Sequence, residues 1–112
     1  MIVKEKYEYQ IGEEIFQGVI CFDNEIEGSR PGVLVSHQYS GCSKLEERKC
    51  EFLAKAGYFA FAIDLYGKDV RGKTPEESLN LMNQLSEDRT VLAKRINHCL
   101  TLLKDHALVE NN

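Results

Sequence analysis

The sequence predicts an α/β fold in which a β-hairpin is followed by a parallel βαβ unit and further helices. Three observations favour this class: two apolar stretches joined by a glycine-containing turn, two continuous apolar runs separated by one amphipathic segment, and helix-starting signals after the second run. With 112 residues, of which 43 % are hydrophobic, the chain is expected to form a single partial domain over residues 1–112.

The hairpin is expected at about residues 2–22. Between Val3 and Ile11 the apolar residues fall on odd positions, and a second apolar stretch runs from Ile15 to Phe22. The intervening Gly12-Glu13-Glu14 is typical of a short hairpin turn. Residues 23–32 are rich in charge and glycine, which predicts a surface loop.

The βαβ unit is expected at about residues 33–64. A non-alternating apolar run begins at residue 33 and another spans residues 58–63, and such runs favour strands buried on both faces. Between them, Ser43 and Glu46 form a capping-box signature, and Gly57 is a typical residue after a helix end. The stripe expected to face the core of this helix comprises Leu45, Phe52, Leu53 and Ala56.

A helical segment is expected at about residues 75–105. The sequence Thr74-Pro75-Glu76-Glu77 combines an N-cap with proline at the first helical position, and Ser86 is expected to cap a last helix. Residues 107–112 are too few to form the next parallel strand of a doubly wound sheet, so one sheet edge is expected to be open. The apolar face of the last helix comprises Leu92, Ile96, Cys99, Leu100 and Leu103.

Composition argues against several classes of function. Lysine and arginine number 14 against 18 acidic residues, which gives a net charge of −4 and no broad basic face for nucleic acid. No apolar stretch reaches the roughly 18–20 residues of a membrane span, and charges interrupt the amino terminus where a signal peptide is apolar. Four cysteines without a CxxC pair indicate reduced thiols, so we expect a cytoplasmic protein without a metal site.

Polar residues follow both strands of the predicted parallel pair. Residues 36–41 come directly after the first strand, and Asp64 and Tyr66 follow the second. Open α/β sheets bind ligands at this edge, so both side chains could line a pocket there, although Asp64 could equally cap the following turn. Arg71, in the polar segment 67–73, could meet a substrate carboxylate or remain a solvated loop cation.

Several segments together resemble the dienelactone hydrolase family. They are the loop HQYSG (37–41), the helix end AGY (56–58), the strand FAFAID (59–64) and the sequence LYGK (65–68), in matching order and spacing. The resemblance extends from the hairpin to about Asp105. It implies the amino-terminal half of an α/β-hydrolase fold that cleaves esters or lactones of small carboxylic acids without a cofactor.

The resemblance also implies a Cys-Asp-His triad whose nucleophile follows the last helix of this chain. No triad residue is therefore carried over to this chain, and the chain alone is expected to be inactive. By position, the backbone amide of Tyr39 matches the family's oxyanion-hole donor. The preceding Gln38 stands where the family often has an acid, and it can exchange hydrogen bonds but cannot take a proton. The expected substrate-binding residues are Gln38, Asp64, Tyr66 and Arg71.

The sequence leaves two possible roles open for each of two residues, and a second possible function for the chain. His37 either bonds loop backbone or contacts substrate, and Cys42 is either a thiol activated by a helix amino terminus or an inert loop cysteine. The charged segments 46–49 and 87–89 are interpreted as solvated helix surface. A non-catalytic module that associates through its open sheet edge, with a second copy or a complementary chain, is the alternative function.

Overall fold

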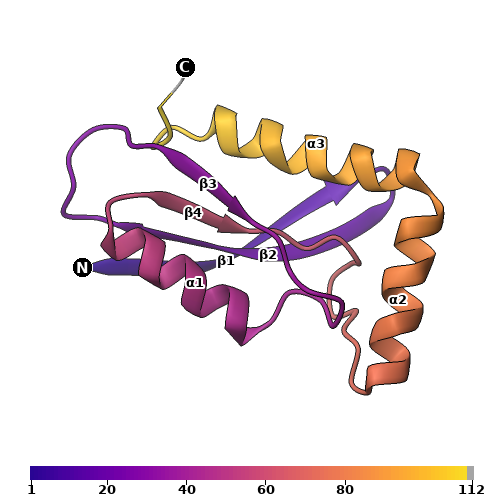
Figure 1. The fold of residues 1–112 in the computed structure, drawn as a ribbon. Coiled ribbons are helices and arrows are strands. Elements are labelled where there is room, and N and C mark those ends of the chain that lie inside the picture. Colours follow the sequence, from indigo (N-terminus) through magenta and orange to yellow (C-terminus); the bar gives the residue numbers. More distant parts are fainter. Residues whose placement is uncertain (111–112) are drawn as a thin grey trace.

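The structure, a computed structural model, describes residues 1–110, in which a four-stranded mixed sheet carries helices on both faces (Figure 1). β1 (Ile2–Ile11) and β2 (Glu14–Asp23) pair antiparallel, and β3 (Gly32–Val35) and β4 (Phe59–Ala62) pair parallel. The strand order is β1-β2-β4-β3, because β2 also pairs antiparallel with β4. The predicted α/β class, the hairpin and the parallel pair are confirmed.

The helices take different places around this sheet. α1 (Lys44–Lys55) covers one face, α3 (Arg89–Asp105) lies across the other, and α2 (Pro75–Glu87) stands beside the sheet at one end of α3 (Figure 1). The predicted start of α2 is confirmed, because the Thr74 hydroxyl accepts a hydrogen bond from the Glu77 amide at 3.1 Å.

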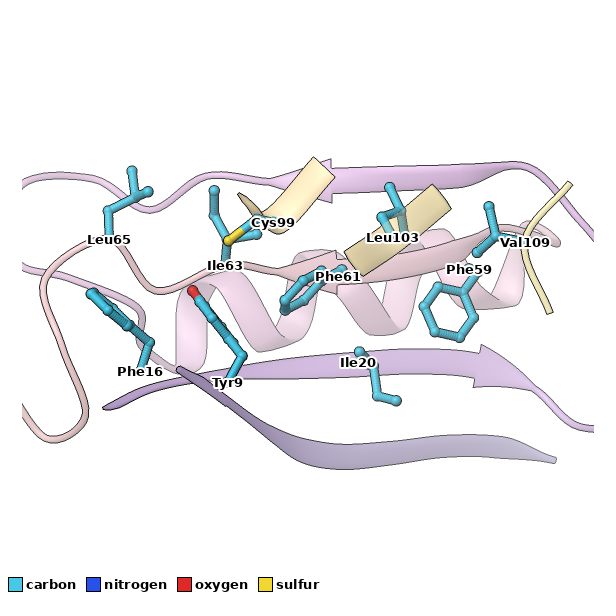
Figure 2. Close-up of a cluster of buried hydrophobic side chains, with 10 residues drawn as sticks. All are labelled: Tyr9, Phe16, Ile20, Phe59, Phe61, Ile63, Leu65, Cys99, Leu103 and Val109. Atoms are coloured by element: carbon cyan, nitrogen blue, oxygen red, sulfur yellow. The ribbon is translucent and has the colours of Figure 1, made fainter. Parts of the chain in front are cut away.

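Side chains alternate between two cores along β2 and β4. Figure 2 shows the core under α3, in which aromatic rings from β1, β2 and β4 pack below the helix. The rings of Tyr9 and Phe16 stack with centroids 5.5 Å apart. This core comprises Tyr9, Phe16, Ile20, Phe59, Phe61, Ile63, Leu65, Cys99, Leu103 and Val109.

The core under α1 contains much smaller side chains. Ala60 and Ala62 present only methyl groups on this face of β4, so α1 lies close to the sheet and buries Cys50 and Ala54 against it. All four cysteines of the chain are buried and unpaired. This second core comprises Val19, Cys21, Val35, Cys42, Cys50, Ala54, Ala60 and Ala62.

The predicted core face of α1 is wrong for Leu45, Phe52 and Ala56, whereas Leu53 packs partly buried against the second core as predicted. The capping box and the helix end at Gly57 are confirmed. Leu45 and Phe52 are 44 % and 73 % exposed, because the close approach to the alanines of β4 selects small residues for the buried face. Glu46, interpreted as solvated surface, is instead buried. Its carboxylate reaches back to accept hydrogen bonds from the Ser43 amide and hydroxyl.

Two predictions about α3 also require correction. The helix is capped by Asp88 rather than Ser86, because the Asp88 carboxylate accepts hydrogen bonds from two amides of the first turn. Of the predicted apolar face, Cys99 and Leu103 are buried whereas Ile96 and Leu100 remain more than one third exposed. The helix therefore covers the sheet with only part of that face.

The outer side of β3 is an edge of the sheet. Val33 and Leu34 are only half-buried for this reason, whereas burial on both faces was predicted. At the start of this edge Val109 forms a single parallel bridge with Arg30, a buried residue within the predicted surface loop. The Arg30 amide donates to the Leu108 carbonyl oxygen at 2.9 Å, so the chain after α3 returns beside β3.

Candidate functional site

The loops that follow β3 and β4 meet at one end of the sheet. His37 Nε2 accepts a hydrogen bond from the Leu65 amide at 3.0 Å, and the Tyr66 hydroxyl donates to the Tyr39 carbonyl oxygen at 2.9 Å. The rings of His37 and Tyr66 also pack together, with centroids 4.6 Å apart. These contacts hold the two loops as one unit.

Residues 38–41 form a β-turn. The Gly41 amide donates to the Gln38 carbonyl oxygen at 3.1 Å, which is the bond that closes such a turn. Gly41 has a φ of 98°, and an added Cβ would lie 2.9 Å from Arg71 Cδ, so glycine is required on both conformational and steric grounds. Within residues 1–110 the Tyr39 amide donates to no acceptor, which leaves it available to a ligand.

A pocket of about 240 Å³ opens beside this turn. Its polar side is formed by the two loops, and its apolar side by α2 and the start of α3. Three of the sequence-predicted site residues, Gln38, Tyr39 and Tyr66, lie together on its wall. The full lining is His37, Gln38, Tyr39, Leu65, Tyr66, Met82, Leu85, Ser86 and Leu92.

Asp64 is fully buried and is not among the residues that line the pocket. Its Oδ1 accepts hydrogen bonds from the Tyr66 and Gly67 amides and its Oδ2 accepts one from the Gln17 amide, each at 3.0 Å. Of the two roles considered for this residue, the structure shows the cap of the following turn. The carboxylate joins that turn to β2.

Arg71 supports the same region from the other side. Its guanidinium donates to the carbonyl oxygens of Cys42, Gly67 and Val70, and one nitrogen lies 3.6 Å from Asp64 Oδ1. Arg71 is therefore not a freely solvated loop cation. It is absent from the lining of the pocket that holds Tyr39, and it provides positive charge beside the buried carboxylate.

Burial and hydrogen bonding bear on the alternatives for His37 and Cys42, and His37 also lies on the pocket wall. His37 bonds loop backbone through both ring nitrogens, and burial lowers its pKa despite the bond to the Gln38 carbonyl. Burial also raises the pKa of the Cys42 thiol to about 12, although Arg71 lies nearby. Burial of Cys42 and its raised pKa favour the inert loop cysteine over the activated thiol.

Two residues that support the site were missed from the sequence. The Tyr9 hydroxyl donates to the Asp64 carbonyl oxygen and accepts from the Asp64 amide at 3.0 Å, and Arg95 Nη1 donates to the Leu65 carbonyl oxygen at 2.7 Å. Both bonds join segments far apart in sequence. Alternation marked Tyr9 only as an inward-facing residue, and nothing in the sequence of the last helix distinguishes Arg95.

Within the described residues, no three His, Cys, Asp or Glu side chains lie together in a way that could hold a metal ion. Among the helices within 1–110, none combines the length and the apolar character that crossing a membrane demands.

Comparison with known proteins identifies relatives of similar fold. The model of the dienelactone hydrolase family matches residues 16–110. No curated protein matches the chain. Among solved structures, a dienelactone hydrolase-like promiscuous phosphotriesterase, P91, from metagenomic libraries matches with a TM-score of 0.90 and 24 % identity. The match covers 98 % of this chain and 46 % of the P91 chain. The structure named m3DLH matches with a TM-score of 0.87 and 27 % identity, and this match covers 97 % of this chain and 45 % of the m3DLH chain. The chain therefore spans less than half the length of these proteins.

Proposed function

Because the chain belongs to the dienelactone hydrolase family, we propose that it supplies the amino-terminal half of a hydrolase of esters or lactones of small carboxylic acids. The observation that carries this proposal is Tyr39, which lines a pocket at the carboxyl end of β3 and whose amide has no acceptor within residues 1–110. The nucleophile and its base are proposed to lie outside these residues. Four buried free thiols favour action in the reducing cytoplasm.

In this proposal the Tyr39 amide stabilises the oxyanion that forms when a nucleophile attacks the substrate carbonyl. A single donor of this kind contributes roughly 3–4 kcal/mol to the transition state. Gln38 and Tyr66 face the same pocket and supply hydrogen-bonding groups for the substrate, whereas Leu85 and Leu92 form an apolar wall for its acyl portion. Asp64 and Arg71 hold the loops from behind.

We predict that the 112-residue chain alone does not turn over p-nitrophenyl acetate faster than its Cys42→Ala variant. The reason is that a covalent acyl-transfer enzyme loses most of its rate without nucleophile and base. The comparison is made by following nitrophenolate release at equal protein concentration. Turnover clearly above that of the variant would contradict the placement of the nucleophile outside these residues.

The role of Tyr39 is tested with a pair of variants in the protein expressed from the native gene. Tyr39→Pro removes the amide hydrogen at the turn position where proline is well tolerated, whereas Tyr39→Ala removes only the side chain. We expect kcat/KM for ester hydrolysis to fall about 10²- to 10³-fold in Tyr39→Pro, as for other oxyanion donors, and to stay within about tenfold in Tyr39→Ala. Equal losses of kcat/KM in both variants would show that the Tyr39 amide does not stabilise the oxyanion.

A second candidate function is association through the β3 edge. A groove of about 580 Å³ lies between β3 and α1, and its wall includes Leu45 and Phe52, the two exposed apolar residues of that helix. An edge strand beside exposed apolar side chains favours pairing with another strand. In this alternative the chain is a non-catalytic module that binds a second copy or a complementary chain.

Light scattering tests this second candidate. The 112-residue chain is expected to exceed the 12.8 kDa of a monomer at high concentration, and Phe52→Asp is expected to restore the monomer because it places a charge in the groove. Leu79→Asp is the matched control, since Leu79 is 47 % exposed on α2, away from the groove. A strict monomer at all concentrations would argue against association of copies.

A further inference from the structure

The peptide group between Gln38 and Tyr39 is held at its carbonyl end. The Gln38 carbonyl oxygen lies 2.7 Å from His37 Nδ1 and also accepts the hydrogen bond from the Gly41 amide. Residues 1–110 have no cis peptide bond, and in a planar trans peptide the N–H points away from its own carbonyl oxygen. The groups that fix the Gln38 carbonyl therefore also fix the direction of the Tyr39 N–H.

The hydrogen bonds of His37 determine which ring nitrogen carries the proton. Nε2 faces the Leu65 amide at 3.0 Å, and because a backbone amide can only donate, Nε2 must be unprotonated. The neutral ring then carries its proton on Nδ1, which donates to the Gln38 carbonyl oxygen. Arg95 holds the Leu65 carbonyl oxygen, and Tyr66 packs against the His37 ring.

We propose that His37 is a positioning residue that orients the Tyr39 amide, and that only its neutral form with the proton on Nδ1 does so. Protonation of Nε2 would set one donor against another at the Leu65 amide, so the ring would turn away. The Gln38–Tyr39 peptide would then keep only the Gly41 bond and would be held less firmly. The orientation of the donor would thus depend on pH, an inference that rests on the proposed function for its catalytic meaning.

Charged groups surround His37 from several elements. Asp64 follows β4, Glu46 lies on α1, Arg71 lies in the loop after β4 and Arg95 on α3. Burial is the largest effect and lowers the pKa of His37. The hydrogen bond to the Gln38 carbonyl and the two carboxylates favour the protonated ring, whereas Arg71 opposes it.

The lowered pKa gives the pH dependence a definite sign. An unfolded chain takes up a proton on this histidine as the pH falls through about 6.5, whereas the folded ring resists protonation. His37 therefore contributes its full stabilisation above about pH 6.5. The free energy of unfolding is expected to fall as the pH is lowered from 6.5 toward the pKa of the folded state.

Nuclear magnetic resonance of the 112-residue chain tests this inference without any need for catalysis. Long-range proton–nitrogen correlations of the imidazole are expected to show the proton on Nδ1 of His37 at pH 7.5. The Tyr39 amide resonance is expected to shift with the titration curve of His37 between pH 8 and pH 5. A proton on Nε2, or a Tyr39 resonance that ignores this titration, would overturn the proposal.

Variants separate positioning from a merely structural role. His37→Asn keeps a side-chain N–H near the Gln38 carbonyl and is expected to retain the Tyr39 resonance position but lose its pH dependence. His106→Asn is the matched control, because burial also lowers the pKa of His106, whose Nδ1 accepts the Leu108 amide away from the site. The Tyr39 titration should persist in this control. If ester hydrolysis fails while these spectra hold, the proposed function is wrong and the positioning contact stands.

Discussion

Replacement of Asp64 by alanine is expected to lower the free energy of unfolding by about 3–5 kcal/mol, a large share of the stability of a small domain. The carboxylate accepts hydrogen bonds from the amides of Gln17, Tyr66 and Gly67, and each buried amide left without a partner costs about 1–3 kcal/mol. The substitution also removes the negative charge beside Arg71. Urea unfolding followed by circular dichroism measures the loss.

Asp64→Asn is the control for this prediction. Asparagine keeps the shape and one acceptor oxygen but turns a donor toward the remaining amide, so it should lose less stability than alanine. Equal stability of Asp64→Ala and the wild-type chain would show that the carboxylate does not hold the turn after β4. The pocket that contains Tyr66 would then need another explanation.

Gly18→Ala is expected to have the next largest effect, a loss of about 3 kcal/mol or more. A Cβ at this position would lie 2.2 Å from the Ala62 carbonyl oxygen and 3.0 Å from Phe61 Cε1. Backbone atoms cannot move aside as a flexible side chain can, so β2 and β4 would have to separate next to the Val19–Ala62 pair. Overpacking of this kind usually costs about 1–3 kcal/mol, and more where backbone must shift.

The control here is Gly28→Ala, which separates steric conflict from backbone strain. A Cβ at Gly28 meets nothing within 4 Å, but its φ of 79° is unfavourable for alanine and should cost about 1 kcal/mol. Urea unfolding of both variants under one condition makes the comparison. A loss at Gly18 no larger than that at Gly28 would contradict the close contact between β2 and β4.

Structural features that depend only on neighbouring residues could be predicted from the sequence. The Ser43 cap, the start of α2 at Pro75 and the hairpin depend on local hydrogen bonds and turn chemistry, and all three are observed. The buried face of α1 could not be predicted, because it is selected by the alanines of β4, which approach only in the folded chain. Phe52 thus looked like a core residue and is largely exposed.

In the site, too, the residues that follow neighbouring strands could be predicted, whereas the bonds between distant segments could not. Gln38, Tyr39 and Tyr66 were expected together because residues at the carboxyl ends of parallel strands share one sheet edge, and all three line the pocket. The bond of His37 to the Leu65 amide spans 28 residues and that of Tyr9 to Asp64 spans 55. No periodicity or spacing in the sequence reports contacts of this kind.

We propose that these residues supply the oxyanion donor to a hydrolase whose nucleophile lies outside them. The most direct test of this proposal is the intact mass of the protein expressed from its native gene, measured together with its hydrolysis of p-nitrophenyl acetate. We predict a mass roughly twice 12.8 kDa, in keeping with relatives of which this chain covers 46 % and 45 %, and measurable ester hydrolysis. A product of 12.8 kDa that hydrolyses no ester would contradict the claim and favour the associating module.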